Sequence, residues 1–229
     1  MCEECGCGEA NEVEVEVEQD ILSENNRYAA HNREHLDKHG VFCVELLSSP
    51  GSGKTTLLEA VIGSDPGLNI SVVEGDIETQ RDAERVRAAG ADAFQLTTGG
   101  ACHLDAKLVH GAFHHIDLEK TDLLFIENVG NLVCPAAFKL GAHQRWVLLS
   151  VPEGDDKPGK YPRAFREASV LVITKTDLIE HMDFDPDKAE REALSLNPYL
   201  KVFRVSAKTG QGIPELVQYL KQGVLSKKA

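Results

Sequence analysis

The segment SSPGSGKTT, residues 48–56, combines glycines, a lysine and hydroxyl residues between an apolar run and a potential helix. Its end fits the nucleotide-binding pattern G-x-x-x-x-G-K-[ST], with Ser48 at the position of the first glycine. Glycines let backbone N–H groups turn toward phosphate oxygens, a lysine reaches the β- and γ-phosphates, and a threonine hydroxyl binds Mg²⁺. A plain strand-to-helix turn is the alternative. We expect a phosphate loop formed by Gly51, Ser52, Gly53, Lys54, Thr55 and Thr56.

Two later segments, TKTD and SAKTG, each follow an apolar run and indicate which base is bound. A carboxylate at Asp177 can accept the N1–H and N2–H hydrogens of guanine, whereas adenine offers no such pair. Thr174 stands where guanine-binding proteins usually have asparagine, which predicts lower affinity with retained specificity. Taken alone, TKTD also fits a helix cap formed by Asp177. Together the segments predict GTP binding through Lys175, Asp177, Ser206, Ala207 and Lys208.

Acidic residues end two of the apolar runs, Asp76 in ISVVEGD and Glu127 in DLLFIEN. Parallel α/β sheets bind ligands at the carboxyl ends of their strands, so both side chains are candidates to hold Mg²⁺ together with Thr55. Gly130, in the segment ENVG, can donate its N–H to a γ-phosphate. No glutamine that would position water directly follows it, which predicts slow hydrolysis. The candidate catalytic residues are Lys54, Thr55, Asp76 and Glu127.

Three donors that suit transition metals lie in the middle of the chain, at Cys102, His103 and Cys134. Two thiolates and an imidazole can bind Zn²⁺ or Ni²⁺. We expect Cys102 and His103 to begin a helix, which would lower the pKa of the Cys102 thiol. The alternative is a pair of unrelated thiols beside a surface histidine.

The N-terminus, MCEECGC, adds three thiols within six residues, at Cys2, Cys5 and Cys7. Removal of Met1 would make the amine of Cys2 a fourth donor. Such a set suits square-planar Ni²⁺, although Zn²⁺ and copper also bind thiolates. The alternative is an incidental cysteine-rich start.

Apolar runs of strand length alternate with amphipathic segments from Val41 onward. The runs are nearly continuous in Val, Ile, Leu and Phe, which is typical of strands covered on both faces in a parallel sheet. We therefore expect an α/β P-loop NTPase with a doubly wound, mostly parallel sheet. The expected strands are residues 41–47, 70–74, 93–96, 122–128, 145–151, 169–175 and 201–206.

The expected organisation is a flexible, cysteine-rich and acidic metal-binding tail at residues 1–19, a helix at 20–40 and a GTPase domain at 41–229. Within the tail, VEVEVE alternates like a strand, but every second position is a carboxylate. We interpret it as a solvated linker, with a short edge strand as the alternative.

Several histidines are spaced one helical turn apart. His31, His35 and His39 share one face of the expected N-terminal helix, and His110 and His114 have the same spacing. We interpret both sets as solvated helix faces, and contact with a metal is the alternative.

Bulk composition excludes several classes of protein. The chain has 229 residues, of which 42% are apolar, and a net charge of -13. An acidic chain repels nucleic acid and anionic lipid, so we expect neither as a partner. No apolar run is long enough for a membrane helix, and the first residues do not fit a signal peptide, which predicts a cytoplasmic protein. Six cysteines in such a protein argue against a disulfide framework, and we assign Cys43 to the core.

The motifs together resemble one family, the hydrogenase nickel-incorporation GTPases (HypB), over nearly the whole chain. The resemblance is carried by SSPGSGKTTLLE, EGDIETQRDAERV, TTGGACHLDA, LLFIENVGNLVCPA, EGDDKP and MCEECGCGE. It implies a SIMIBI-type G domain that uses GTP and Mg²⁺, a tight nickel site at Cys2, Cys5 and Cys7, and a GTP-dependent homodimer. It also implies that Cys102, His103 and Cys134 bind Ni²⁺ or Zn²⁺ near the subunit interface.

The partners that the resemblance implies are a small zinc-containing hydrogenase maturation protein and the precursor of the [NiFe]-hydrogenase large subunit. Some members of the family carry a long histidine-rich tract near the N-terminus, which this chain lacks, so we do not expect bulk nickel storage. Two other functions stay open. One is a stoichiometric nickel- or zinc-binding module without essential turnover, and the other is a urease accessory GTPase.

Overall fold

The computed structural model describes residues 7–64, 66–76 and 81–228, with residues 7–19 and 76 described by their backbone alone. A seven-stranded sheet forms the centre of the fold, in the order β3-β2-β4-β1-β5-β6-β7, and every pairing is parallel. Each strand matches one of the expected apolar runs, so the predicted doubly wound α/β sheet is confirmed. The strands are β1 (Phe42–Ser48), β2 (Ile70–Asp76), β3 (Asp92–Thr97), β4 (Leu123–Glu127), β5 (Gln144–Ser150), β6 (Val170–Thr174) and β7 (Lys201–Arg204).

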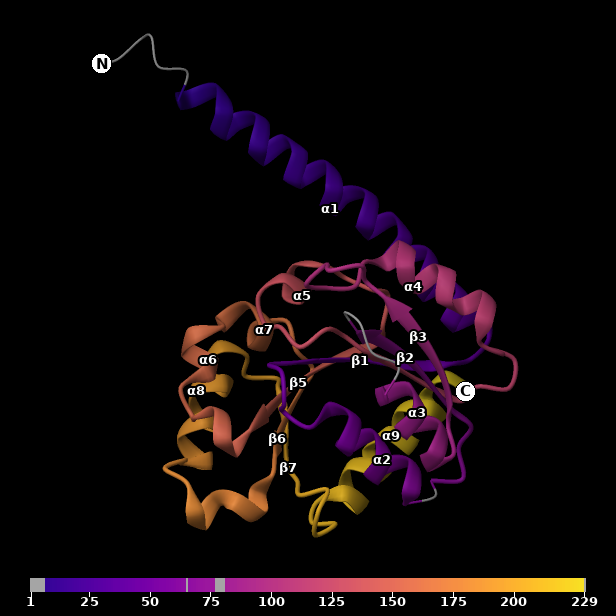
Figure 1. Cartoon of the computed structure of the whole chain (residues 1–229), viewed down its shortest axis with the longest axis vertical. Coiled ribbons are helices and arrows are strands. Elements are labelled where there is room, and N and C mark those ends of the chain that lie inside the picture. Colours follow the sequence, from indigo (N-terminus) through magenta and orange to yellow (C-terminus); the bar gives the residue numbers. More distant parts are fainter. Residues whose placement is uncertain (1–6, 65, 77–80, 229) are drawn as a thin grey trace.

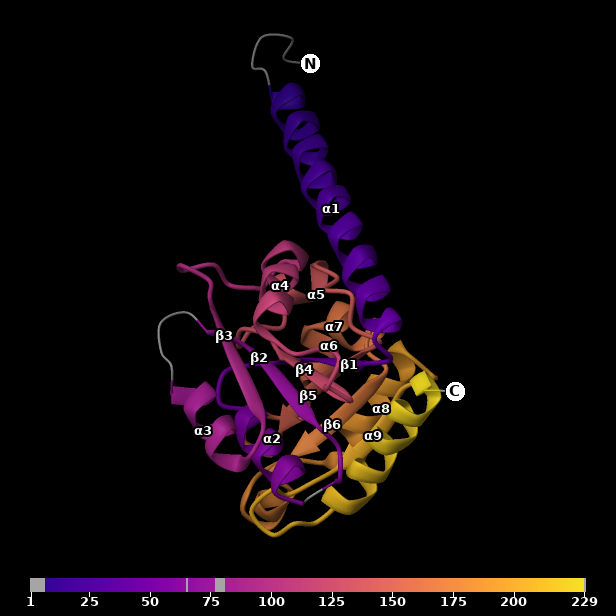
Figure 2. The ribbon, with the colours of Figure 1, turned by 90° about the vertical axis from the view of Figure 1, so that its right-hand side faces the viewer.

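Helices cover both faces of the sheet (Figures 1 and 2). One apolar core joins the sheet to α2 (Lys54–Gly63), α3 (Arg81–Ala89) and α9 (Ile213–Lys228). On the other face, one core lies under the end of α1 (Cys7–Lys38) and α4 (Ala106–Ala112), and a second lies under α7 (Pro162–Arg166) and α8 (Pro186–Leu196). The shorter elements are η1 (Phe113–His115), α5 (Cys134–Ala137), η2 (Val151–Glu153), α6 (Lys157–Lys160) and η3 (Thr176–His181).

The first helix, α1, differs from the expected tail. We expected residues 1–19 to form a linker or an edge strand, but the chain is helical from Cys7 onward. The repeated glutamates of VEVEVE are good helix formers, and this segment contains no glycine or proline that would end a helix after residue 8. The helix ends as predicted beside Gly40, whose positive φ of 65° is typical of a residue that follows a helix.

The N-terminal part of α1 projects away from the sheet, while its C-terminal part lies along α4 (Figures 1 and 2). Cys7 is at the first helical position, and the remaining cysteines of the expected nickel tail, Cys2 and Cys5, lie outside the described residues. The contacts of all three thiols therefore stay predictions.

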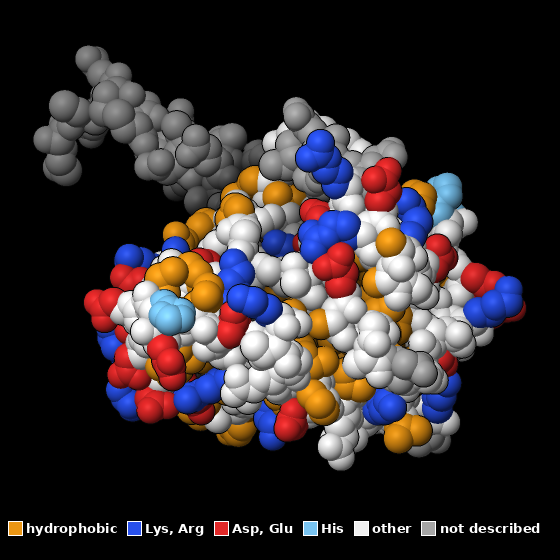
Figure 3. All heavy atoms as spheres, turned by 60° about the horizontal axis from the view of Figure 1, so that its bottom comes forward, with side chains coloured by type: hydrophobic (Ala, Val, Ile, Leu, Met, Phe, Trp, Pro, Cys, Tyr) orange, Lys and Arg blue, Asp and Glu red, His pale blue; other side chains and the backbone are white. Residues whose placement is uncertain are grey.

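The exterior carries charges of both signs. On the face seen in Figure 3, acidic and basic side chains are interspersed around small apolar areas. Within the described ranges, no helix combines the length and the apolar character needed to cross a bilayer.

Cys43 lies fully buried in β1, as expected for a core thiol, and burial raises its pKa.

Candidate functional site

The phosphate loop connects the end of β1 to the start of α2. Gly51 and Gly53 have positive φ values of 74° and 89°, which a residue with a Cβ rarely adopts. This curled backbone leads into the first turn of α2, where free N–H groups and the helix dipole favour an anion. Lys54 is the first residue of α2, and its Nζ donates a hydrogen bond to Ser48 Oγ at 2.9 Å. The serine that replaces the usual glycine is thus a partner of the phosphate-loop lysine.

Two buried carboxylates face the loop from neighbouring strands. Thr55 Oγ1 donates to Glu127 Oε1 at 3.2 Å, and Lys54 Nζ lies 3.9 Å from the same oxygen. Glu74 of β2 lies beside Glu127 in the sheet register, and its Oε1 is buried without a hydrogen-bond partner. Burial raises the pKa of both carboxyl groups, and the charge of Glu127 raises that of Glu74 further.

This group of oxygens suits a hard divalent cation. Mg²⁺ prefers carboxylate and hydroxyl oxygens, and a cation would compensate the charge that burial disfavours on Glu74 and Glu127. Glu74, whose Oε1 has no hydrogen-bond partner, lines the cavity of about 460 Å³ together with Lys54 and Thr55. The residues present therefore fit a magnesium site. Asp76 ends β2 beside this cavity, but its side chain lies outside the described residues.

The loop after β4 lies against the phosphate loop. A Cβ on Gly130 would lie 3.0 Å from the backbone of Pro50, which is a tight contact, so glycine favours this close approach. A backbone bridge between Ser48 and Asn131 joins the two loops again. Gly130 also lines the phosphate cavity, which puts its backbone in the region where we predicted a γ-phosphate contact.

The segments expected to bind guanine meet at the ends of β6 and β7. Ser206 Oγ donates to Asp177 Oδ1 at 2.7 Å, and the ammonium group of exposed Lys208 lies 3.9 Å from the other carboxylate oxygen. These contacts orient Asp177 and leave it at the wall of a cavity of about 290 Å³ that Ala207 also lines. This cavity is mainly apolar apart from a few polar groups, which is typical of a site for a flat base.

Thr174 and Lys175 tie the base-binding region to the phosphate loop. Thr174 Oγ1 donates to Ser52 O at 2.7 Å, and Lys175 Nζ donates to Gly51 O at 2.6 Å. Lys175 adopts a left-handed backbone with φ of 59°, which directs its chain across the loop. The hydroxyl of Thr174 thus supplies a link between the two regions despite replacing asparagine. The base and phosphate cavities share Gly53, Thr56 and Lys175, so they form one continuous binding surface.

The three expected transition-metal donors come together from two loops. Cys102 Sγ lies 3.6 Å from Nδ1 of His103, and the thiols of Cys102 and Cys134 are close enough to hydrogen-bond. The ring of His103 stacks on Phe138, with ring centroids 4.0 Å apart, and burial lowers its pKa. In the described part of the chain, however, no three such donors already converge at metal-binding geometry. A metal would have to draw these side chains together.

One expectation about Cys102 is wrong. Cys102 and His103 do not begin a helix, because they lie in a bend ahead of α4, whose N-cap is Asp105. The Asp105 side chain accepts from Leu108 N and so caps the helix itself. The pKa of Cys102 is raised rather than lowered, chiefly by its hydrogen bond to the Cys134 thiol. A metal that takes both groups as thiolates must therefore displace the protons of both thiols.

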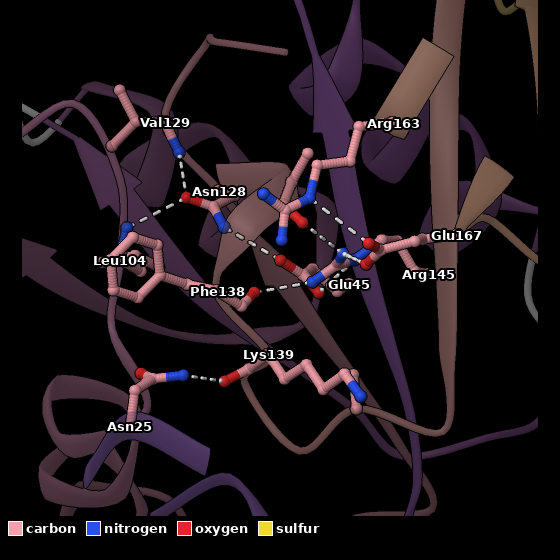
Figure 4. A network of polar contacts seen from close by, with 12 residues as sticks. Asn25, Glu45, Leu104, Asn128, Val129, Phe138, Lys139, Arg145, Arg163 and Glu167 are labelled. Carbon is pink, nitrogen blue, oxygen red and sulfur yellow. Dashed lines mark hydrogen bonds and ion pairs between the residues drawn. The ribbon is translucent and has the colours of Figure 1, made fainter. Parts of the chain in front are cut away.

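A buried polar network joins the segment after His103 to the segment after β4 (Figure 4). Asn128 follows Glu127 and is completely buried. Its Oδ1 accepts from Leu104 N at 3.1 Å and from Val129 N at 2.9 Å, while its Nδ2 donates to Glu45 Oε1 at 2.9 Å. Asn128 therefore fixes the residue after His103 and the residue before Gly130 with one side chain.

The same network continues to α5, which begins at Cys134. Arg145 pairs with Glu45 through Nε at 3.0 Å and donates to the carbonyl oxygens of Ala136 and Phe138 (Figure 4). Burial raises the pKa of Glu45, and the guanidinium of Arg145 opposes this shift. An unbroken chain of contacts thus runs from the Cys102 loop through Asn128, Glu45 and Arg145 to the end of α5.

Glu74, Asn128 and the Glu45–Arg145 pair were not predicted from the sequence. Glu45 and Glu74 did leave a signal, since each is a carboxylate inside an otherwise apolar run. A charge at a buried strand position must be paired or must serve a ligand. Asn128 carried no comparable signal, because its role depends on two loops that only the folded chain brings together.

The parallel sheet, the phosphate loop and the adjoining base cavity define a P-loop nucleotide-binding protein. Residues 43–204 match the family described as "CobW/HypB/UreG, nucleotide-binding domain". The hydrogenase maturation factor HypB of Rhizobium leguminosarum bv. viciae is 49% identical over 214 residues, which cover 93% of this chain and 72% of that protein. The chain therefore belongs to the CobW/HypB/UreG family and, within it, to the HypB hydrogenase maturation factors.

Solved structures agree with this assignment. The crystal structure of HypB from Helicobacter pylori in complex with nickel has a TM-score of 0.85 at 42% identity, and the match covers 89% of this chain and 96% of that one. The cell division protein FtsY of Thermotoga maritima has a TM-score of 0.55 at 15% identity, covering 75% of this chain and 64% of that one. This second likeness bears on the fold alone.

Proposed function

We propose that this chain is a GTP-hydrolysing nickel chaperone that helps to insert nickel into the large subunit of [NiFe]-hydrogenase. The observation that carries the proposal is the bonding of Asn128 to both Leu104 and Val129. One side chain thereby connects the loop of Cys102 and His103 to the loop of Gly130. A contact between Gly130 and a γ-phosphate would therefore change the positions of Cys102 and His103. Nucleotide-dependent metal transfer requires such a coupling between the two sites.

The nucleotide would span the two adjoining cavities. Asp177 would accept the two guanine donors, with Ser206 and Lys208 holding its carboxylate and the backbone at Ala207 near O6. The backbone of residues 51–56 would bind the phosphates together with Lys54. When bound, Mg²⁺ would neutralise charge on the β- and γ-phosphates. Thr55, Asp76 and Glu127 are its predicted ligands, to which the structure adds Glu74 as a neighbouring carboxylate.

Hydrolysis would be slow, because no glutamine follows Gly130 to orient water. A slow GTPase acts as a switch, since the bound state persists long enough for a partner to respond. In the proposal, GTP brings two copies of the chain together and changes the spacing of Cys102, His103 and Cys134. Nickel is the cargo of that site, and Zn²⁺ is the competing ion for the same donors.

The N-terminal cysteines would form a separate, tighter nickel site. Cys2, Cys5 and Cys7 supply thiolates at short spacing, and α1, which begins at Cys7, projects away from the sheet. The proposed partners are the small zinc-containing maturation protein and the hydrogenase large-subunit precursor. In this organisation, residues 1–19 act as the metal-binding tail and residues 41–229 as the GTPase domain.

The proposal is tested by restoring hydrogenase maturation in a strain that lacks this protein. The wild-type chain is expected to restore hydrogenase activity at limiting nickel, and the Lys54→Ala variant to fail although it is produced at the same level. Restoration by Lys54→Ala would instead favour a stoichiometric metal-binding module. Restoration of urease but not hydrogenase activity in a strain that has both enzymes would favour the urease accessory function.

A further inference from the structure

The fold gathers four imidazoles from two neighbouring segments. His31 and His35 lie one turn apart on α1, and His110 of α4 and His114 of η1 have the same spacing. The ring centroids of His31 and His35 are 4.7 Å apart, those of His31 and His110 are 4.8 Å apart, and those of His35 and His110 are 5.5 Å apart. The ring of His114 lies 5.7 Å from that of His110. We call this group the four-histidine cluster.

The ring spacing of the cluster fits a shared metal ion. A metal–nitrogen bond of about 2.0–2.1 Å puts each ring centroid about 3.2 Å from the metal, so neighbouring imidazole ligands have centroids about 4.5–5.2 Å apart. Two of the three separations within the His31, His35 and His110 triad fall in this range, and the third exceeds it by 0.3 Å. Little movement of the helices is therefore needed for the three rings to share one ion.

A buried asparagine fixes the protonation of the central ring. Asn32 is completely buried, and its Nδ2 donates to Ala106 O at 2.8 Å and to Leu140 O at 3.0 Å. Both amide hydrogens are thereby used, and Oδ1 lies 3.0 Å from Nδ1 of His110. Because Oδ1 can only accept, His110 must carry its proton on Nδ1 and keep the lone pair of Nε2 free. Metal-binding histidines are usually oriented in this way by a partner of their other nitrogen.

The neighbouring cation of α4 has a partner outside the cluster. The nearby ammonium group of Lys107 is directed over the ring of Tyr28, with 5.8 Å between Nζ and the ring centroid. Neutral imidazoles are good ligands for Ni²⁺, Zn²⁺ and Cu²⁺.

We propose that His31, His35 and His110 bind one Ni²⁺ ion at a site made of imidazoles alone, separate from every cysteine-containing site. The described donors do not yet converge at metal-binding geometry, so the side chains must rotate about their χ angles. His31 is exposed and has room to do so, as has His114, which is the available fourth donor. The site depends on neither nucleotide nor hydrolysis, so it stands or falls independently of the proposed GTPase cycle.

The test uses the full chain, purified without a polyhistidine tag, with the cysteine donors removed. In this background Cys2, Cys5, Cys7, Cys102 and Cys134 are replaced by serine. Equilibrium dialysis against Ni²⁺ is expected to give one bound ion per chain with a micromolar Kd. Adding His31→Gln and His35→Gln is expected to weaken binding more than tenfold. His181→Gln, at an exposed histidine of η3, is the matched control and is expected to leave binding unchanged.

X-ray absorption of the nickel-loaded background protein adds an independent readout. Scattering by imidazole nitrogen without sulfur is expected. The proposal is overturned if the background protein binds no nickel in the micromolar range, or if the double histidine variant binds as well as its parent. An equal loss in the His181→Gln control would also overturn it, since binding would then follow the histidine count rather than the cluster. Circular dichroism checks that each variant is folded.

Discussion

Replacing Asn128 by alanine should uncouple the metal-donor loops from the nucleotide loop. The substitution removes the acceptor of Leu104 N and Val129 N and the donor to Glu45 Oε1. Each buried polar group left without a partner costs about 1–3 kcal/mol, so for the three groups we expect the free energy of unfolding to fall by about 3–9 kcal/mol. Urea unfolding monitored by circular dichroism measures this loss.

The functional consequence of Asn128→Ala is a smaller difference in nickel affinity between the GDP-bound and GTP-bound states. Coupling energies between two sites are typically about 1–3 kcal/mol, which corresponds to affinity ratios of about 5–150. We expect the ratio of nickel affinities measured with GDP and with a non-hydrolysable GTP analogue to approach one in Asn128→Ala. Isothermal titration with Ni²⁺ in the two nucleotide states gives this ratio directly.

Two further variants separate coupling from stability. Asn128→Asp keeps an acceptor for Leu104 N and Val129 N but sets a carboxyl group against Glu45, so it should destabilise the fold while retaining most of the coupling. Asn197→Ala removes donors to Arg166 O and Ala168 O, away from the metal-donor loops, and should leave the ratio unchanged. The reasoning is refuted if a folded Asn128→Ala protein keeps the wild-type ratio.

Three other predictions concern the base, the cation site and acid stability. Asp177→Asn should weaken GTP binding about 100-fold and improve binding of xanthosine triphosphate, because the new amide can donate to the extra carbonyl of xanthine. Competition with a fluorescent nucleotide measures both affinities. An unchanged affinity for GTP would contradict the assignment of Asp177 to guanine binding. Glu74→Gln should weaken binding of Mg²⁺–GTP about tenfold and leave the affinity for metal-free GTP, measured in EDTA, unchanged. Equal losses of GTP affinity with and without Mg²⁺ would indicate a fold defect instead. Burial lowers the pKa of His143 to about 4, and its Nδ1 accepts from Cys43 N at 3.0 Å. Since the neutral ring is the folded form, its contribution to stability is complete above pH ~6.5 and is lost as the pH falls toward 4. Wild-type protein should therefore lose about 1–2 kcal/mol more unfolding free energy between pH 6.5 and 4.5 than His143→Gln, and parallel curves would contradict this.

The sheet could be predicted from the sequence because burial on both faces leaves a local signal. All the expected strands are present, since runs such as LLFIE have no polar face to expose. The phosphate and base segments were predictable for a related reason, because short sequence motifs determine the glycine conformations and their order along the chain.

Contacts between distant segments were not predictable in this way. The histidines of α1 and α4 suggested wet helix faces, because nothing in the sequence says that those faces meet. Cys102 was assigned to a helix start, although the chain places Asp105 three residues later as a better cap. The extent of α1 was missed because glutamate and valine in alternation satisfy both a strand pattern and a helix without breakers.

Coupling between nucleotide and metal is tested by the nickel affinity of the unmodified protein in two nucleotide states. The same preparation is titrated with Ni²⁺ after loading with GDP and after loading with a non-hydrolysable GTP analogue. We expect the Kd of the Cys102, His103 and Cys134 site to differ at least fivefold between the two states. Equal affinities at that site in both states would contradict it.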